Sequence, residues 1–338
     1  MKKKLIVGVI ALLSLALTYG FANAAVTGTC SSCHTMHDSQ NGVGDIGSPG
    51  QQPYLTLFSC LACHTSGGAA NAPKIDGTNA ASGTGSGVLS DAGGDYDATV
   101  GDKATRHDLL AADVFDMVPP GYVTAGGLTW TNQKVTCEGT YGCHGKHGTS
   151  PDLGVHGMHH GTSTAFRWLY AQTQNTGAAG TAVNGLESTT WEAGGATQTN
   201  HNVYDSDSTD SVSIFCANCH GIFHDAANTG SSSPFTRHPT DEEAVIANID
   251  GAGFTPTSAE IDETPFAFTT AQITAGMVTT DNTTGTAYTS ANGKAMCLSC
   301  HRAHGTAYKD ILRFNYSDMN AGNTTNNHGC ETCHVNQR

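Results

Sequence analysis

One five-residue unit, Cys-x-x-Cys-His, recurs along this chain and constrains it more than any other feature. It occurs as CSSCH, CLACH, CANCH, CLSCH and CETCH, which begin at residues 30, 60, 216, 297 and 330. A stretched version, CEGTYGCH, spans residues 137 to 144. These six units contain all 12 cysteines, and a histidine directly follows each pair. This pattern is the attachment signature of c-type haem, in which two thioether bonds hold the haem and the histidine ligates its iron.

The sequence therefore predicts six haem c groups, and it predicts no catalytic residues. The cysteines expected to form thioethers are Cys30, Cys33, Cys60, Cys63, Cys137, Cys143, Cys216, Cys219, Cys297, Cys300, Cys330 and Cys333. The histidines expected to ligate iron from the proximal side are His34, His64, His144, His220, His301 and His334.

The third motif differs from the others because five residues, not two, separate Cys137 and Cys143. The intervening loop has to bulge outward for both sulfurs to reach one haem, and Gly139 and Gly142 would permit this. The alternative is a Cys137–Cys143 disulfide without haem. Haem is favoured because a histidine follows at once.

The first 24 residues predict an export signal that is cleaved from the mature protein. Three lysines precede an apolar run from Leu5 to Thr18, and Ala22-Asn23-Ala24 forms a cleavage site. The run is short for a membrane span. We expect residues 25 to 338 to form a single multihaem domain, located outside the cell or in the periplasm.

Two other uses of the cysteines explain the pattern less well. Export places the chain in an oxidising compartment, where disulfides are common, and structural zinc binds cysteine and histidine together. Neither requires a histidine after every second cysteine. The formal net charge of −14 argues against nucleic acid or anionic lipid as a partner.

The composition predicts a mostly coiled fold with short α-helices and little β-structure. Only 38% of the residues are hydrophobic, which is too few to bury a large protein core. We therefore expect the chain to wrap around a row of six covalently bound haems. Helices are expected at residues 102 to 114, at residues 164 to 172 and after the capping box of Thr240 and Glu243. Loops are expected at residues 82 to 94, 175 to 185 and 279 to 292.

The distal iron ligands have to come from the 11 histidines outside the six proximal positions. Four of them lie just beyond a motif, where each can reach a neighbouring haem more easily than its own, and these are His37, His147, His224 and His304. The others are His107, His156, His159, His160, His201, His238 and His328. Axial methionines at Met36, Met158 or Met296 are an alternative that would raise the reduction potential.

Several motifs resemble the extracellular hexahaem cytochromes of the OmcS type, which polymerise into conducting filaments in metal-reducing bacteria. The similarity lies in CSSCHTMH near the start, His107, CHGKH at residues 143 to 147, CANCHGIFH followed by residues 236 to 239, and CLSCHRAH followed by residues 313 to 315. CETCH stands close to the C-terminus, as in that family.

The resemblance implies six bis-histidine haems stacked in single file, in alternating parallel and T-shaped pairs. Its distal ligands are His37, His107, His147, His224, His238 and His304. It also implies that His37 ligates the fifth-motif haem of a neighbouring copy, which is a heterologous contact and builds an open filament. The implied partners are copies of the chain, redox partner cytochromes and extracellular electron acceptors.

Electron transfer along such a filament is the function that the resemblance predicts. A soluble electron shuttle with the same haems is one alternative. A multihaem reductase is another, but it needs an iron with an open coordination position. No Cys-x-x-Cys-Lys occurs, and the histidines suffice to fill every site.

Overall fold

The structure of the chain is a computed structural model. It describes residues 29–34, 39–40, 43–44, 60–64, 75, 93–94, 106–107, 118–122, 130, 135–145, 155, 158–160, 165–171, 180–187, 202–206, 209–224, 238, 240–241, 264–274, 293–319 and 329–330. The expected export signal and the expected loop at residues 279 to 292 lie outside these ranges.

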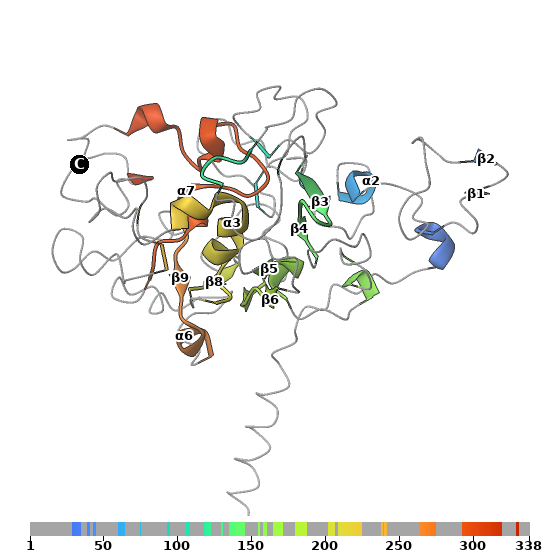
Figure 1. The fold of residues 1–338 in the computed structure, drawn as a ribbon, viewed down its shortest axis with the longest axis horizontal. Coiled ribbons are helices and arrows are strands. Elements are labelled where there is room, and N and C mark those ends of the chain that lie inside the picture. Colours follow the sequence, from blue (N-terminus) through green and yellow to red (C-terminus); the bar gives the residue numbers. More distant parts are fainter. Residues whose placement is uncertain are drawn as a thin grey trace, which may run out of the picture.

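The helices are short, as the composition predicts (Figure 1). The α-helices are α2 (Cys60–His64), α3 (Val212–His220), α6 (Thr270–Thr274) and α7 (Cys297–Cys300). The 3-10 helices are η1 (Cys30–Ser32), η5 (Met158–His160), η6 (Phe166–Trp168), η7 (Gly221–His224), η9 (Lys309–Ile311) and η10 (Tyr316–Asp318). No helix among the described residues is long and apolar enough to span a bilayer.

The strands are two or three residues long and form small separate sheets. They are β1 (Ser39–Gln40), β2 (Val43–Gly44), β3 (Thr136–Glu138), β4 (Gly142–His144), β5 (Tyr170–Ala171), β6 (Thr181–Ala182), β7 (Gly185–Leu186), β8 (Val203–Asp205) and β9 (Ala267–Phe268). Strands β1 and β2 pair antiparallel, as do β5 and β6, whereas β3 and β4 pair parallel. In the largest sheet, β8 lies between antiparallel β7 and parallel β9.

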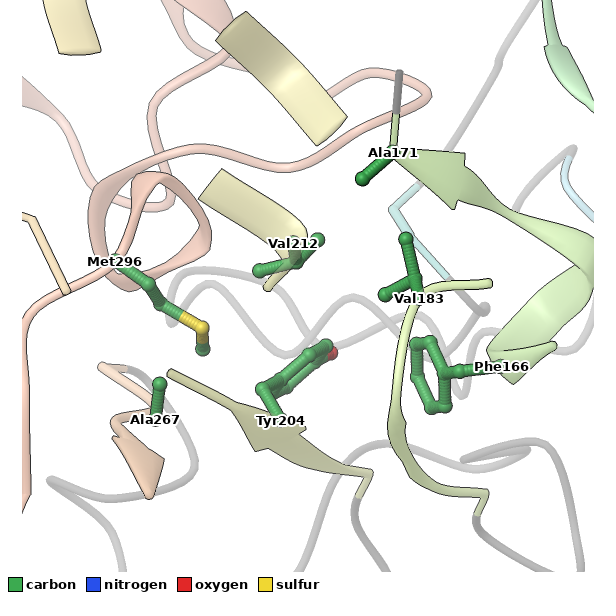
Figure 2. Close-up of a cluster of buried hydrophobic side chains, with 7 residues drawn as sticks. All are labelled: Phe166, Ala171, Val183, Tyr204, Val212, Ala267 and Met296. Atoms are coloured by element: carbon green, nitrogen blue, oxygen red, sulfur yellow. The ribbon is translucent and has the colours of Figure 1, made fainter. Parts of the chain in front are cut away.

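A protein core does form, although the sequence analysis assigned that role to haem alone. Figure 2 shows its seven buried side chains, which are Phe166, Ala171, Val183, Tyr204, Val212, Ala267 and Met296. The Phe166 and Tyr204 rings meet edge to face with centroids 5.6 Å apart, a favourable aromatic geometry. The residues of this cluster lie on or beside β5 to β9, in η6, in the first turn of α3 and directly before α7. This cluster therefore fixes the elements that lead into the fourth and fifth motifs.

Two of the methionines considered as axial ligands lie in apolar clusters. Met296 belongs to the core and is 2% exposed. Met158 packs with Ala165 and Tyr170 in a smaller cluster. Met36 lies outside the described residues.

The helix expected at residues 164 to 172 is wrong. Only Phe166–Trp168 is helical, as the single 3-10 turn η6, and Tyr170–Ala171 is a strand. Arg167 and Trp168 have φ angles of 48° and 58°, in the left-handed region where a right-handed helix cannot continue. The expected loop at residues 175 to 185 is also wrong in part, because it contains β6 and the start of β7.

The other two expected helices are also not seen where the structure describes them. Within residues 102 to 114 it describes Arg106 and His107, and Arg106 forms an antiparallel bridge with Gly305. After the expected cap at Thr240, Asp241 has a φ of 62°, which is not helical; Glu243 lies outside the described residues. In the expected loop at residues 82 to 94, Gly93 and Gly94 have φ angles of 77° and 100°.

Candidate haem-binding sites

The regular motifs are helical where the structure describes them. The first motif begins in η1, the second forms α2, the fourth forms the end of α3 and the fifth begins in α7. Residues three apart on a helix lie on the same face, so the two cysteines of each motif point the same way. This is the arrangement that one haem edge requires.

The third motif has a different backbone. Cys137 lies on β3 and Cys143 on β4, which pair in parallel register with Thr136 opposite Gly142 and Glu138 opposite His144. Both cysteines are free thiols, so the structure contains no disulfide between them.

The extra residues of the third motif form a turn that requires glycine at both positions singled out in the sequence. Gly139 has a φ of 88°, which glycine adopts readily. A Cβ at Gly142 would overlap backbone atoms of Glu138. The amide of Gly142 donates to the carbonyl of Gly139 at 3.1 Å, and the amide of Thr136 donates to the carbonyl of Tyr141 at 3.2 Å. The stretched loop is therefore a hydrogen-bonded turn.

Three proximal histidines have a backbone carbonyl at Nδ1. The distances are 2.9 Å from His144 to Arg167, 2.8 Å from His220 to Pro120 and 2.8 Å from His301 to Asp310. A carbonyl oxygen can only accept, so Nδ1 carries the proton in each case. Metal-bound histidines usually donate their second ring nitrogen in this way, which leaves Nε2 as the ligand.

A left-handed turn holds both the ring and the backbone of His144. In η6 the carbonyl of Arg167 accepts from the His144 ring, and the carbonyl of Trp168 accepts from the amide of Gly145 at 2.7 Å. His144 also forms an antiparallel bridge with Leu169. The amide of Arg167 is in turn held by the Glu187 carboxylate at 2.8 Å.

The same turn recurs at the fifth motif. Asp310 and Ile311 of η9 have φ angles of 58° and 56°. The carbonyl of Asp310 faces the His301 ring, and the carbonyl of Ile311 accepts from the amide of Arg302 at 2.9 Å. His301 forms an antiparallel bridge with Leu312. The stretched third motif and a regular motif thus share one device for holding a proximal histidine.

Four proximal histidines each face a second histidine ring. The centroid distances are 6.3 Å for His34 with His160, 6.4 Å for His64 with His159, 6.1 Å for His144 with His304 and 6.1 Å for His220 with His107. Imidazole binds first-row metals at about 2 Å, so two rings on opposite sides of one iron have centroids roughly 6 Å apart. The spacing of all four pairs therefore fits an iron atom between the rings.

Burial favours the neutral imidazole that binds metal. It lowers the pKa of His144 and of His220, and it lowers the pKa of His159 to about 4. A neutral ring retains a lone pair on the nitrogen that is not protonated.

The facing histidines agree only in part with the predicted distal set. His107 and His304 were predicted, and His304 faces His144 of the third motif instead of His301 of its own. His159 and His160 were not in the predicted set. Their adjacency in the sequence was the available signal, because neighbouring residues on η5 can face two neighbouring motifs.

Of the other predicted distal histidines, the structure describes His224 and His238. Nε2 of His224 lies 3.5 Å from the Asp241 carboxylate, and His238 is exposed. Outside the described residues lie His37, His147, His156, His201, His328 and the proximal His334.

Hydrogen bonds to backbone carbonyls hold His304 and His107 side by side. The His304 amide donates to the Gly93 carbonyl at 2.8 Å, and the His107 amide donates to the His304 carbonyl at 3.2 Å. Nδ1 of His107 lies 2.6 Å from the Ala303 carbonyl. A Cβ at Gly93 would lie 3.0 Å from the His304 ring, so glycine gives this ring its space.

Contacts between cysteines place the motifs in sequence order. The thiols of Cys60 and Cys137 lie close enough to shift each other's pKa, as do those of Cys216 and Cys297. These two contacts link the second motif to the third and the fourth to the fifth.

Two further links complete the order from the second motif to the sixth. Burial and then the charge of Cys219 raise the pKa of Cys143 to about 12. Burial and then the charge of Cys330 raise the pKa of Cys300 to about 11. Adjacent histidines of η5 face the first two motifs, so the described parts of the motifs lie one after another in sequence order. Figure 1 shows η1, α2, the β3–β4 pair, α3 and α7 following one another from right to left.

Comparison with known proteins finds a CXXCH motif family and a c-type cytochrome. Residues 290–338 match the doubled CXXCH motif family. The C-type cytochrome OmcS of Geobacter sulfurreducens is 26% identical over an alignment of 379 positions, which covers 93% of this chain and 85% of the relative.

Two solved structures from the same organism have a similar fold. The Outer Membrane Cytochrome S filament is 22% identical with a TM-score of 0.52, and the alignment covers 87% of this chain and 84% of the other. The OmcS nanowires are 20% identical with a TM-score of 0.52, with 86% and 84% covered. This chain is therefore similar to OmcS in sequence over nearly its whole length, and its fold is similar to that of the OmcS filament structures.

Proposed function

We propose that this chain is an exported hexahaem c-type cytochrome that carries electrons along its row of haems. We propose further that it polymerises into extracellular filaments that deliver electrons to external acceptors. The observation that carries the proposal is the spacing of the four histidine pairs, 6.1 to 6.4 Å, along motifs that follow one another in space. One-electron chemistry is what haem iron supplies when bound.

The chain's own contribution is to attach, ligate and shield each haem. The cysteine pairs anchor the six groups, and the carbonyls at Nδ1 fix the orientation of the proximal rings. We assign the axial pairs as His34 with His160, His64 with His159, His144 with His304 and His220 with His107. These four assignments use His159 and His160, which were not in the predicted distal set, together with His107 and His304, which were.

His301 differs from these four histidines. Within the part of the chain that the structure describes, no histidine ring faces it. We therefore keep the expectation that His37 of a neighbouring copy ligates this fifth haem. For His334, the remaining candidates of the predicted set are His147, His224 and His238.

The proposal that the chain polymerises rests on the expected ligation by His37 of a neighbouring copy and on the similar solved structures. The two similar solved structures are described as a filament and as nanowires. A ligand donated from one copy to the next uses two different surfaces, so repetition builds an open chain of subunits. Copies of the chain, partner cytochromes and extracellular acceptors are its proposed partners.

The proposal is tested on the purified, exported protein by its haem content and its spin state. Intact mass and haem absorbance should give six haems per chain, and electron paramagnetic resonance should show only low-spin ferric haem in the assembled protein. Five haems with a Cys137–Cys143 disulfide would contradict the six-haem count. A high-spin ferric haem that survives assembly would instead favour a reductase with an open iron.

A further inference from the structure

We propose that the extra residues of the stretched third motif position the axial ligands of the haems on either side of it. Glu138 would act on the ligands of the first and second haems, and Tyr141 on that of the fourth. This inference rests on the proposed function. It also gives the longer spacing between Cys137 and Cys143 a physical purpose.

Glu138 holds the segment that leads to the distal histidines of the first two motifs. Its Oε2 accepts a hydrogen bond from the backbone amide of Val155 at 2.8 Å. The Val155 carbonyl then accepts from the amide of Met158 at 2.9 Å, where η5 begins. A carboxylate is a stronger acceptor for an amide than a neutral group, so this contact is well suited to anchoring a turn.

The anchored turn presents two adjacent rings in two directions. His160 stacks opposite His34 at 6.3 Å with an interplanar angle of 18°, and His159 lies opposite His64 at 6.4 Å with an angle of 46°. Trp168 packs edge to face on His159 with centroids 4.6 Å apart. A shift of η5 would therefore move both histidines together.

Tyr141 connects the bulge to the other side through two aromatic contacts. Its ring meets Trp130 edge to face at 5.1 Å, and Trp130 meets Tyr122 at 6.3 Å. Trp130 is 4% exposed, so the middle ring of this series is well packed.

The aromatic series ends at the loop that holds His220. The Tyr122 amide donates to the Pro119 carbonyl at 3.0 Å, and the Pro120 carbonyl accepts from the His220 ring at 2.8 Å. The next carbonyl, that of Gly121, accepts from the amide of Ile222 at 2.9 Å. The loop thus contacts the fourth motif on both sides of its helix end.

A regular motif has only two residues between its cysteines. Its two intervening residues lie within one helical turn, as in α7. In the third motif, the parallel register places Glu138 beside His144, and the turn that follows carries Tyr141. Proximal ligand and anchors are therefore parts of one rigid unit.

The direct test compares Glu138→Ala with Glu138→Gln in the haem-loaded protein. The alanine variant loses the acceptor for the Val155 amide, whereas glutamine retains a side-chain oxygen. We expect the alanine variant to show a new high-spin signal or shifted low-spin signals from the first two haems, with all six haems still attached. We also expect exchange of the Val155 amide to be about tenfold faster. Glutamine should restore most of both readouts.

Repeating the substitution in a protein that lacks both distal histidines identifies the haems that Glu138 affects. In a His159→Ala/His160→Ala protein, adding Glu138→Ala should produce no further spectral change. A wild-type spectrum and wild-type Val155 exchange in the alanine variant would overturn the inference, as would a change confined to the third haem. Loss of low-spin ligation in the unmodified protein would instead contradict the proposed function.

Tyr141 has its own matched pair of variants. Tyr141→Ala should shift the reduction potential and the low-spin signal of the fourth haem, because the loop at Pro120 loses its packing. Tyr141→Phe keeps the ring and should behave like the unmodified protein. Identical potentials in both variants would overturn this half of the inference.

Discussion

In four histidines, Nδ1 of the ring lies within hydrogen-bonding distance of a backbone carbonyl oxygen. They are His107, His144, His220 and His301. A carbonyl fixes the tautomer and the ring orientation as a carboxylate would, but without adding negative charge. At residue scale, the ligand geometry is therefore set by main chain, which side-chain patterns in a sequence do not reveal.

His304 offers the clearest test of a single axial ligand. It follows the fifth motif in sequence, yet its ring faces His144 at 6.1 Å. We expect His304→Ala to convert the third haem, and not the fifth, to a high-spin form, as measured by electron paramagnetic resonance.

Two variant proteins, each lacking one haem, distinguish ligation of the third haem from ligation of the fifth. Without the third haem, in a Cys137→Ser/Cys143→Ser protein, His304→Ala should add no high-spin signal. Without the fifth, in a Cys297→Ser/Cys300→Ser protein, it should still add one. The reverse pattern would show that His304 serves its own motif.

Asp310 tests the left-handed turn that holds His301. Valine tolerates a φ of 58° poorly, so Asp310→Val should cost about 1–2 kcal/mol of stability and shift the reduction potential of the fifth haem. Asp310→Gly accepts this backbone angle and should leave the potential unchanged. Denaturation and spectroelectrochemistry measure the two effects, and equal potentials in both variants would argue against the turn's role.

At the scale of elements, the sequence shows the Cys-x-x-Cys-His motifs directly but not the structure around them. The expected helix at residues 164 to 172 combined good spacing of apolar residues with no sign of a break. Its chain turns left-handed at Arg167 because Glu187 and Asn202, distant in sequence, hold that residue. The strands are similarly decided by partners far along the chain, which a local pattern cannot show.

The turn of the third motif was predictable because it contains two glycines. Gly139 has a positive φ, and Gly142 has no room for a Cβ. Gly142→Ala would force a Cβ into the backbone of Glu138, so we expect a large loss of the third haem. Gly139→Asn keeps a residue that tolerates positive φ and should cost less than about 1 kcal/mol. Intact mass gives the haem count of each variant; full loading of the alanine variant would contradict the parallel arrangement of β3 and β4.

At the scale of the whole molecule, the described parts of the Cys-x-x-Cys-His motifs follow one another in the order of the chain. That order was only suggested by histidines close to each motif. We expected each of them to reach the next haem, but the ring of His304, beyond the fifth motif, faces His144 of the third motif, which is not adjacent to the fifth in this order. The ligand pairs themselves depend on folding of distant segments, such as the meeting of Gly93, His107 and His304. For this reason His159 and His160 could not be chosen from a set of 11 histidines by sequence alone.

His37 tests assembly. If it ligates the fifth haem of a neighbour, His37→Ala should give single subunits with one high-spin haem while the other five stay low-spin. Size-exclusion chromatography and electron paramagnetic resonance measure the two effects. Normal polymers of this variant would contradict the shared ligand, and the nearby Thr35→Ala provides a control for substitution in the same segment.

The most direct test of the central claim is an electron cryomicroscopy map of the haem-loaded, exported protein. We expect filaments with six haems per subunit in one continuous row, with His34–His160, His64–His159, His144–His304 and His220–His107 as axial pairs. Discrete particles would contradict polymerisation. A gap in the row at Cys137 and Cys143 would contradict the continuous path for electrons.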